Sequence, residues 1–256
     1  MIACNSDSYV LRRTLKDQSS LYPSSFATYL ILPRLLTALQ YGGASAAAIL
    51  PLVLLLSKGA GDSDPEVVIK PIVALYKSPD RGTRMALLDS LGEYVDKLDQ
   101  KVVVNDVWPN LQTGFSDTVA VIREATVKSI ILLAPKVRSY SFCLRNWFTV
   151  ACILQLSDRI MNNDLLRHLA KMQTDPEASI RTNTCILIGR LGPQLGYNTK
   201  RKMLVPAFAR ALKDPFVHTR VAGLMAFMAS VDLFDAEACS GKVVPCVSVS
   251  LIDKEK

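Results

Sequence analysis

The sequence is poor in the residues that build metal sites and disulfide scaffolds. It has only two histidines in 256 residues, which argues against a His-rich metal site. Its six cysteines show no C-x-x-C spacing and are too sparse for a disulfide framework. We therefore expect free thiols in a reducing compartment, and we predict no cofactor and no metal.

The sequence also lacks a recognisable targeting or membrane segment. Residues 1–10 contain no basic stretch followed by an apolar core, so no signal peptide is predicted. The most apolar run, residues 43–56, is about four residues short of the roughly 18 that suggest a spanning helix, and it contains Pro51. This run is predicted to be a buried helix, and no integral membrane insertion is expected.

Catalytic motifs are missing as well. The chain has no G-x-S-x-G elbow and no Gly-rich phosphate loop, and the glycines at 189 and 192 are predicted to end a helix. His168 and His218 are predicted to be ordinary packed or solvated side chains. Half of the residues are apolar and 21% are charged, which excludes a disordered chain.

A proline recurs at one position in a series of similar apolar segments. The steps from Pro33 to Pro71 and from Pro71 to Pro109 are both 38, and the step from Pro206 to Pro245 is 39. Self-similarity at such a period is the signature of a repeat architecture. The chain is therefore predicted to be an array of repeats.

A second position in each repeat carries an arginine six residues after an acidic or hydroxyl residue. The pairs are Ser78 and Arg84, Asp117 and Arg123, Asp175 and Arg181, and Asp214 and Arg220. Apolar side chains follow each arginine at four and seven positions, which places them on one face of a helix. The first residue of each pair is predicted to be an N-cap, with a proline next to three of them at the first helical position. The residues four after each arginine, expected to be buried between repeats, are Leu88, Val127, Cys185 and Leu224.

Each unit is thus predicted to contain a first helix with the proline, a short turn and a second helix. Two helices per period of about 39 residues are typical of the HEAT/armadillo class, so we predict an all-α fold, a right-handed α-solenoid of about five to six helix pairs. Residues six apart on a helix lie on different faces, so each arginine is expected to reach the aspartate of a neighbouring repeat. This structural ladder, which is not catalytic, is expected to contain Asp117, Arg123, Asp175, Arg181, Asp214 and Arg220.

The period is broken once, between two of the ladder arginines. The step from Arg123 to Arg181 is 58 instead of 39, and the excess follows the helix that contains Arg123. Removing residues 137–155, which contain no acidic residue, restores the period. A retained intron (valine codons begin with GT, and a glutamine codon can be CAG) and a loop between repeats are both open interpretations. Residues 1–256 are otherwise predicted to be a single HEAT-like repeat domain, truncated at both ends.

The most strongly charged region is basic. Residues 178–213 contain seven Lys and Arg and no acidic residue, and Lys200 to Lys202 are predicted to lie just before the helix that contains Pro206. Such a cluster can contact phosphates, whereas base stacking needs interleaved aromatics, and only Tyr197 and Phe208 are near. A solvated repeat edge and a polyanion contact are both open. The candidate contact residues are Arg190, Lys200, Arg201, Lys202, Arg210 and Lys213.

The repeats resemble one family, the SCY-like pseudokinases, also called N-terminal kinase-like proteins. The matching segments are residues 31–38 (ILPRLLTA), 122–129 (IREATVKS), 132–136 (LLAPK), 180–184 (IRTNT), 214–216 (DPF) and 219–223 (TRVAG). The resemblance covers nearly all of the chain apart from residues 137–155 and the first few residues. In that family an inactive kinase-like domain precedes a HEAT-repeat region, and a low-complexity tail follows.

The chain resembles the repeat region alone, because it has no V-A-I-K, H-R-D or D-F-G motif. The resemblance implies a non-catalytic scaffold that binds protein partners. It implies coatomer in Golgi–ER vesicle traffic or the machinery of cytoplasmic tRNA export as partners, and a cytoplasmic location, at the Golgi or near nuclear pores. The alternative is a direct tRNA-binding module that uses the basic repeats.

Overall fold

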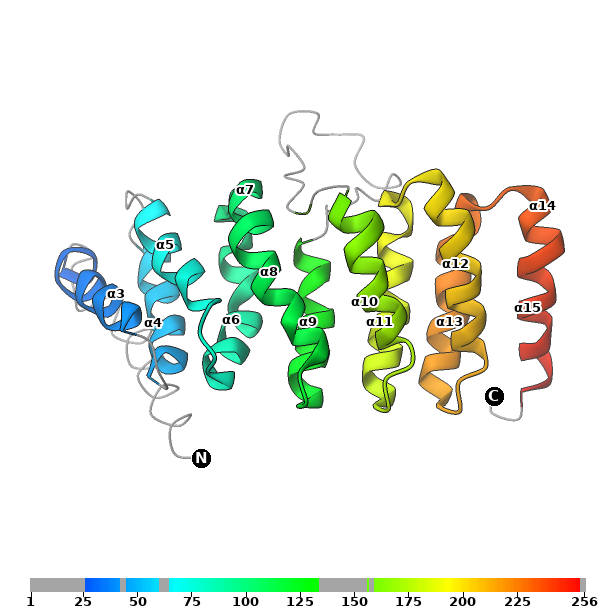
Figure 1. The fold of residues 1–256 in the computed structure, drawn as a ribbon, viewed down its shortest axis with the longest axis horizontal. Coiled ribbons are helices and arrows are strands. Elements are labelled where there is room, and N and C mark those ends of the chain that lie inside the picture. The colour runs from blue at the N-terminus through cyan, green and yellow to red at the C-terminus, as the bar shows by residue number, and fades with distance from the viewer. Residues whose placement is uncertain (1–25, 42–44, 60–64, 134–155, 157–158, 254–256) are drawn as a thin grey trace. The chain divides into compact units, whose positions relative to one another are not determined.

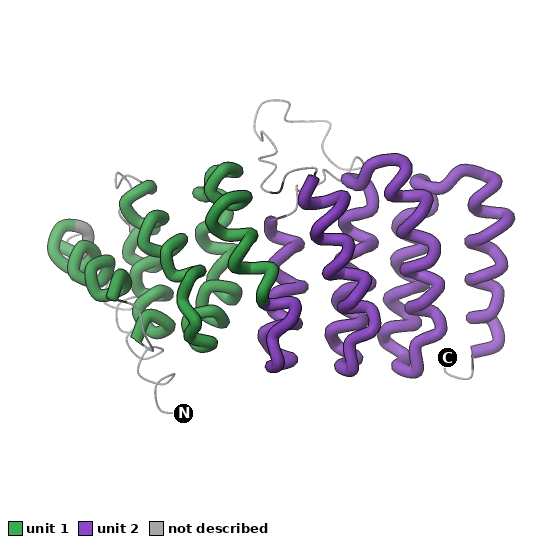
Figure 2. Tube along the Cα trace, in the orientation of Figure 1, with its two compact units in different colours: residues 1–113 green, residues 114–256 purple. Residues whose placement is uncertain are grey.

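The structure, a computed structural model, describes residues 26–41, 45–59, 65–133, 156 and 159–253. The regular elements within these ranges are all helical, and no strand occurs among them (Figure 1). The all-α prediction is therefore confirmed. The chain divides into two compact units, residues 1–113 and residues 114–256 (Figure 2). The single repeat domain stays a prediction.

Unit 1 contains two helix pairs and one further first helix. In the first pair, η1 (Ala27–Ile31) runs into α3 (Leu32–Gln40) and is followed by α4 (Ala46–Gly59). The second pair is α5 (Pro65–Leu75) and α6 (Arg81–Tyr94). The short η2 (Val95–Lys97) follows α6 directly. The further first helix is then built from α7 (Gln100–Val102), η3 (Val103–Val107), α8 (Trp108–Leu111) and η4 (Gln112–Ser116), which extends into unit 2.

The longest apolar run of the sequence forms α4 and is buried, as predicted. Leu50 and Val53 are inaccessible to solvent, Leu54 is nearly so, and α4 packs against α3 and α6. Among the described helices, none combines the length and the apolar character that crossing a membrane requires.

Unit 2 contains the second helix α9 (Ala120–Leu133), then two complete helix pairs, and then one more first helix at the C-terminal end of the described residues. One pair is η5 (Ile160–Asp164) with α10 (Leu165–Met172), followed by α11 (Ala178–Leu191) and η6 (Gly192–Gln194). The other is α12 (Tyr197–Leu212) and α13 (Val217–Ala229), followed by η7 (Val231–Leu233). A continuous helical stretch then runs through α14 (Ala236–Ala238), η8 (Cys239–Val243), α15 (Val244–Ser248) and η9 (Val249–Ile252).

The second helices of unit 2 lie side by side in the order α9, α11, α13 (Figure 1). Of the four residues expected between repeats, Leu88, Val127 and Cys185 are buried. Leu224 is only half-buried, so that part of the prediction was wrong. The reason is that α11 covers one side of α13, while the described part of the chain places no second helix on the other side.

The recurring proline lies inside the first helices, and a wider helical turn precedes it in three of them, though not at Pro71 in α5 or Pro206 in α12. Segments of π-helix end at Ile31, Val107 and Val243, in each case two residues before the proline. Proline lacks an N–H group and its ring clashes with the carbonyl four residues earlier. A turn with i→i+5 bonding moves that carbonyl away from the ring and relieves this clash in the three helices that contain it.

The second helices begin later than the sequence predicted. The N-cap is Asp80 instead of Ser78 in α6, Glu177 instead of Asp175 in α11, and Phe216 instead of Asp214 in α13. The prolines therefore precede the caps and do not occupy the first helical position. The aspartate accepts a hydrogen bond from the backbone N–H two residues later, at 2.9 Å for Asp117, 3.0 Å for Asp175 and 2.8 Å for Asp214. It thus forms an Asx turn that leads the chain into the helix.

Gly114 provides a test of the packing against α9. A Cβ atom at this position would overlap Oγ1 of Thr126 and lie 3.2 Å from its Cγ2. Thr126 is buried and its hydroxyl donates to the Ile122 carbonyl at 2.7 Å, so it cannot turn away without losing that bond. We expect Gly114→Ala to lower the free energy of unfolding by about 1–3 kcal/mol in urea titrations.

Gly241 supplies the control, because a Cβ atom there would meet nothing within 4 Å. Since alanine is the better helix former by about 1 kcal/mol, Gly241→Ala should leave stability unchanged or raise it. Equal effects of the two substitutions would contradict the packing described for Gly114.

Candidate functional site

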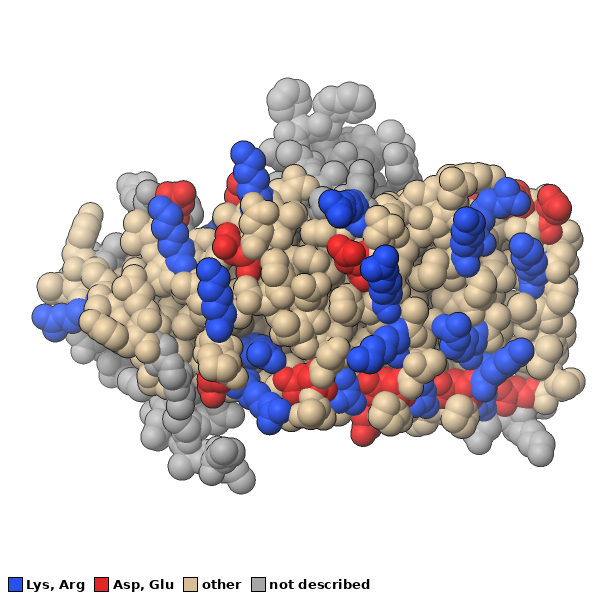
Figure 3. All heavy atoms as spheres, in the orientation of Figure 1, with Lys and Arg blue, Asp and Glu red and all other residues tan. Residues whose placement is uncertain are grey.

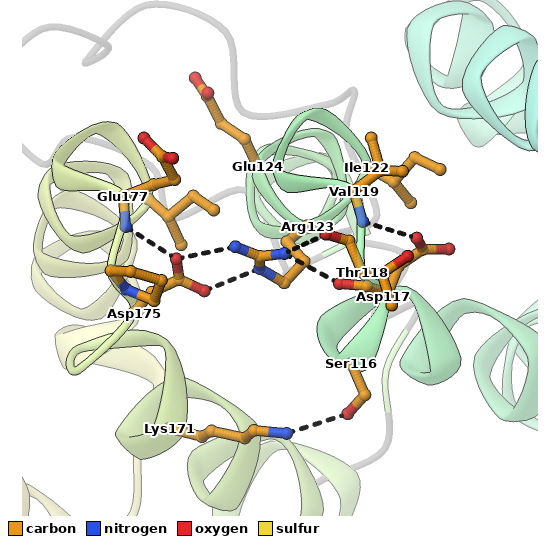
Figure 4. Close-up of polar contacts among 12 residues, drawn as sticks. Ser116, Asp117, Thr118, Val119, Ile122, Arg123, Glu124, Lys171, Asp175 and Glu177 are labelled. Atoms are coloured by element: carbon orange, nitrogen blue, oxygen red, sulfur yellow. Dashed lines mark hydrogen bonds and ion pairs between the residues drawn. The ribbon is translucent and has the colours of Figure 1, made fainter.

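A ladder of ion pairs runs along the turns that open the second helices of unit 2 (Figure 4 shows one rung). In each rung an arginine donates from Nε and Nη2 to both carboxylate oxygens of an aspartate in the following repeat. This is the bidentate geometry that gives charge-assisted bonds their strength and direction. The rungs are Arg123–Asp175 (2.7 and 3.0 Å), Arg181–Asp214 (2.6 and 2.9 Å) and Arg220–Asp253 (2.6 and 3.0 Å).

The remaining nitrogen of each guanidinium holds the turn of its own repeat. Nη1 of Arg123 donates to the carbonyls of Asp117 and Thr118 at 2.9 and 3.2 Å. Nη1 of Arg181 donates in the same way to Asp175 and Pro176, both at 2.9 Å. One side chain therefore fixes the turn within a repeat and the contact to the next repeat. This explains why the aspartate and the arginine are always six residues apart.

The ladder is shielded from solvent, so its ion pairs are not ordinary surface pairs. The side chains of Asp175 and Asp214 are 4% and 8% exposed. Hydrogen bonds from Arg181 lower the pKa of Asp214. At Asp175, burial alone would raise the pKa, but the bonds from Arg123 and the Glu177 N–H outweigh it and the pKa is lowered. The predicted contact between neighbouring repeats is confirmed for Arg123 and Arg181. Arg220 extends it to Asp253, which the sequence analysis missed.

The number of residues between the two partners of each rung also shows the break in the repeat period. Arg123 and Asp175 are 52 residues apart, whereas the partners of the other two rungs are 33 residues apart. The difference equals the length of the segment assigned to the insertion, and the bond lengths with and without it, 2.7 and 3.0 Å against 2.6 and 2.9 Å, are nearly equal. Residues 137–155 themselves lie outside the described residues. The rung that spans these residues therefore has the same geometry as the uninterrupted rung.

A second row of polar contacts joins the second helices and was not predicted. Glu124 of α9 accepts hydrogen bonds from Ser179 at 2.9 Å and from Asn183 at 3.1 Å, both on α11. The hydroxyls of Thr182 on α11 and Thr219 on α13 are hydrogen-bonded at 2.8 Å. Glu124 and Thr182 each follow a ladder arginine directly, and this shared position was the signal that could have revealed the row.

The basic residues near Lys200 lie in α12 itself, which corrects their predicted place before the helix. Gly196 caps α12, and its N–H donates to Asn162 Oδ1 at 3.0 Å, so the helix begins at Tyr197. Lys200, Arg201 and Lys202 are therefore in the first two turns, and the first turn contains no acidic residue. Positive charge at this end opposes the helix dipole, so this arrangement costs stability.

The structure brings only some of the candidate contact residues together. Lys202, Arg210 and Lys213, the residue that caps the C-terminal end of α12, are exposed and, at spacings of 8 and 3 residues, lie on the outer side of this helix. Lys200 is half-buried on the flank of that helix. Arg190 is exposed but belongs to α11, in the layer of second helices.

Arg201 differs from the other candidate residues because its side chain is held by contacts to neighbouring residues. The Arg201 guanidinium lies 5.7 Å from the centre of the exposed Tyr197 ring and donates to its hydroxyl at 3.2 Å. It also lies 3.9 Å from Asp235. Phe208, the other aromatic near the cluster, is fully buried and unavailable for base stacking.

Two basic residues of α10 extend the outer face of α12. Arg167 and Lys171 are exposed on α10, whose C-terminal end contacts α12 through Gln173. Gln173 donates to the Ala207 carbonyl at 3.1 Å and accepts a hydrogen bond from Arg210. In Figure 3, Lys and Arg side chains are visible over α10 and α12 on this face of unit 2. We call Arg167, Lys171, Lys202, Arg210 and Lys213 the basic surface. Lys171 and Arg210 occupy the same position in successive repeats, which was the missed sequence signal.

The described residues contain no group of three or more His, Cys, Asp or Glu placed to hold a metal ion. Burial raises the pKa of the Cys185 thiol to about 12, so it is protonated and inert. His168 stacks on Phe115 with ring centres 4.9 Å apart, which fits the predicted packed histidine. The glycines at 189 and 192 flank the end of α11 at Leu191, as predicted.

The Arg181–Asp214 rung tests the energetic weight of the ladder. Arg181→Ala would leave the shielded Asp214 carboxylate without its cation, so we expect it to lower the free energy of unfolding by about 3 kcal/mol. Arg201→Ala removes a 3.9 Å pair between half-exposed side chains and should cost less than about 1 kcal/mol. Similar losses for the two variants would show that the ladder behaves like ordinary surface pairs.

The same rung has a predictable dependence on pH. Because folding lowers the pKa of Asp214, the contribution of the rung is complete above the unfolded value of about 3.9 and is lost as pH falls through the folded pKa. The stability difference between wild type and Arg181→Ala should therefore shrink in acid.

Deleting residues 137–155 tests whether the insertion is separable from the repeats. The deletion removes Arg138 and Arg145, so the formal charge falls from +7 to +5. Since the rung across the insertion already has the geometry of the uninterrupted rung, we expect the shortened chain to fold with equal or higher melting temperature and soluble yield. Arg123→Ala should cost the same stability in both chains. An unfolded deletion variant would mean that the segment is a structural part of its repeat.

The retained-intron interpretation has its own test. It predicts a spliced transcript that lacks the codons of this segment.

Comparison with known proteins gives several curated relatives. "Probable inactive serine/threonine-protein kinase scy1" of Dictyostelium discoideum is 30% identical over 234 residues, which are 91% of this chain and 26% of the relative. "Cytoplasmic export protein 1" of Saccharomyces cerevisiae is 31% identical over 183 residues, 72% of this chain and 22% of the relative. "Protein kinase domain-containing protein ppk3" of Schizosaccharomyces pombe is 28% identical over 202 residues, 78% of this chain and 28% of the relative. The chain thus spans about a quarter of the length of these proteins.

A solved structure agrees with these relatives. The crystal structure of Cex1p matches with a TM-score of 0.73 at 27% sequence identity, over 88% of this chain and 41% of that chain. The chain matches no protein-family model. The sequence relatives and the shared fold agree with the resemblance of the repeat motifs, and the chain therefore belongs to the SCY-like pseudokinase family, where it corresponds to the helical-repeat region.

Proposed function

We propose that the chain is a non-catalytic adaptor that presents a helical-repeat surface to protein partners. The observation that carries this proposal is the 30% sequence identity between this chain and a relative named as an inactive kinase. The described part of the matching region consists of helical repeats. The chemistry of unit 2 agrees with it. The most shielded charged groups of that unit, the ladder aspartates and arginines, are used to fix one repeat to the next.

The pathway we propose is the cytoplasmic step of tRNA export, with coatomer-dependent vesicle traffic as the other assignment. The name of the relative "Cytoplasmic export protein 1" and the likeness to Cex1p support a role in export, and the family resemblance of the repeat motifs supplies tRNA as the cargo. The second rests on the family resemblance of the repeat motifs. Both assignments place the chain in the cytoplasm, near nuclear pores in the first case and at the Golgi in the second.

Direct contact with tRNA is a second candidate function, supported by the basic surface. Five exposed cations from α10 and α12 lie on one layer of unit 2. Further positive charge lies at the N-terminus of α12, where it costs stability, and such a cost points to a use for it. The exposed aromatic there, Tyr197, is engaged by Arg201. The surface is therefore suited to phosphates rather than to bases.

A salt titration of tRNA binding distinguishes the two functions. Replacing Lys202, Arg210 and Lys213 together by Glu should weaken binding regardless of RNA sequence. It should also reduce the slope of log K against log salt by about 0.7–0.9 for each phosphate that the variant no longer neutralises. The matched control replaces Lys77, Lys97 and Lys101, three exposed lysines of unit 1, and changes the net charge equally.

Each outcome favours a different function. Loss of affinity in the first variant alone supports direct tRNA contact. Equal effects in both variants would mean that the binding depends only on net charge, and no measurable binding would leave the adaptor function as the remaining proposal.

For the adaptor function, purified coatomer and purified tRNA-export components should be retained by the immobilised chain. If both are retained only by a longer form that carries a kinase-like domain, the repeats are not the binding element.

A further inference from the structure

The five cations of the basic surface lie on two stripes, one on each of two neighbouring first helices. Each stripe consists of the residue at the proline position and the residues four before, four after and seven after it, which share one face of a helix. The first stripe carries Arg167 and Lys171, and the second carries Lys202, Arg210 and Lys213. The remaining members are Asn163, Thr174 and Pro206. All of these side chains are exposed, and none is acidic.

The positive charge is specific to these two helices. In the part of the chain that the structure describes, no other first helix has a charged residue at any of the four stripe positions. Ordinary solubilising charge would be spread over the outer faces of all repeats. A local excess of one sign on one face is instead typical of a polyanion contact.

One cation of each stripe is held in place by a neighbouring side chain. Lys171 donates to Oγ of Ser116 at 3.3 Å. Arg210 donates to Oε1 of Gln173, which is buried and itself donates to a backbone carbonyl of α12 at 3.1 Å. The next repeat fills the position of Gln173 with the apolar Leu212, so packing does not require an amide there. The amide of Gln173 therefore serves to orient Arg210.

The stripes lack the aromatic side chains that single strands require. Proteins that bind single-stranded nucleic acid stack its bases on aromatic rings along a positively charged groove. No aromatic residue occupies a stripe position. The exposed rings of Tyr197 and Phe216 lie before and after the second stripe, and they contact Arg201 and His218 respectively. A nucleic acid on this surface would therefore be held by its sugars and phosphates.

We propose that the basic surface binds the backbone of a double-stranded RNA stem. The phosphates of a duplex are already fixed in space, and its two strands together present them at twice the density of one strand. Cations that are themselves held in place meet such an array with little further loss of side-chain freedom. A flexible single strand, in contrast, has to be ordered on binding, a cost that base stacking would normally offset.

The neutral members of the first stripe favour RNA over DNA. The 2′-hydroxyl group, which both donates and accepts hydrogen bonds, is what lets a protein tell RNA from DNA. Asn163 and Thr174 are exposed at the two ends of the stripe. The amide of Asn163 also donates and accepts, and the Thr174 hydroxyl, which donates to the Lys171 carbonyl at 2.9 Å, still accepts through its oxygen. Both side chains thus match the 2′-hydroxyl in chemistry.

This stem contact rests on the direct RNA contact proposed above and names the part of the RNA that is bound. Fluorescence anisotropy with the whole chain, at one fixed salt concentration, tests it with three probes. They are an RNA duplex of about 16 base pairs, a non-pairing RNA strand of twice its length with as many phosphates, and a DNA duplex of the same sequence. The RNA duplex should bind at least about tenfold tighter than the single strand, and severalfold tighter than the DNA duplex.

Variants with unchanged net charge assign this preference to the basic surface. Gln173→Leu releases Arg210 and should weaken duplex binding about threefold to tenfold, with a smaller effect on the single strand. The matched control Gln112→Leu makes the same exchange in η4 and should change neither affinity. Asn163→Leu combined with Thr174→Val should remove the preference for RNA over DNA and keep the preference for a duplex.

The outcomes separate the stem contact from the function on which it rests. Equal or tighter binding of the single strand would overturn the stem contact and leave direct RNA contact standing, and so would a duplex preference unchanged in Gln173→Leu. No binding of any probe would overturn both, without affecting the adaptor function. The comparison of probes uses the unaltered chain, so it is decisive even if a variant fails to fold.

Discussion

The bidentate bond between an arginine and the aspartate of the next repeat is the interaction on which the rest of unit 2 depends. Each guanidinium uses its Nε and Nη2 atoms for the neighbouring repeat and its Nη1 atom for the carbonyls of its own turn. The aspartate that receives it also accepts from a backbone N–H two residues later. The rung therefore fixes three things at once: the turn, the start of the second helix and the position of the next repeat.

The repeat could be predicted from the sequence because its marker residues have geometric roles. The arginines, at regular steps with one longer step between Arg123 and Arg181, indicated the helix pairs, the contact between repeats and the length of the insertion. The exact helix starts could not be predicted, because Asp175 and Asp214 hydrogen-bond to a backbone N–H before the helix begins, and an aspartate in an Asx turn looks the same in sequence as an N-cap. The exposure of Leu224 depends on the absence of a neighbouring helix among the described residues, which a repeat pattern does not record.

The candidate basic site was predicted in composition but not in arrangement. Seven cations without an acid marked residues 178–213, yet only those on the outer face of α12 gather, while Arg190 belongs to another layer. Arg167 and Lys171 join the surface from α10, outside the charged stretch, because Gln173 holds the end of α10 against α12. Contiguity in a helical repeat follows the repeat period and not the order of residues along the chain.

The shielding of the ladder has a consequence for temperature. Water hydrates charged groups with a large loss of entropy, so the cost of removing Asp175 and Arg123 from water falls as the solution is heated. Their mutual attraction changes much less over the same range. Apolar burial, which holds α11 against α13, does not grow in the same way. The ladder therefore supplies a larger share of the cohesion between repeats in warm conditions than in cold ones, and it resists thermal separation of the helix pairs at the stage where apolar contacts alone would give way.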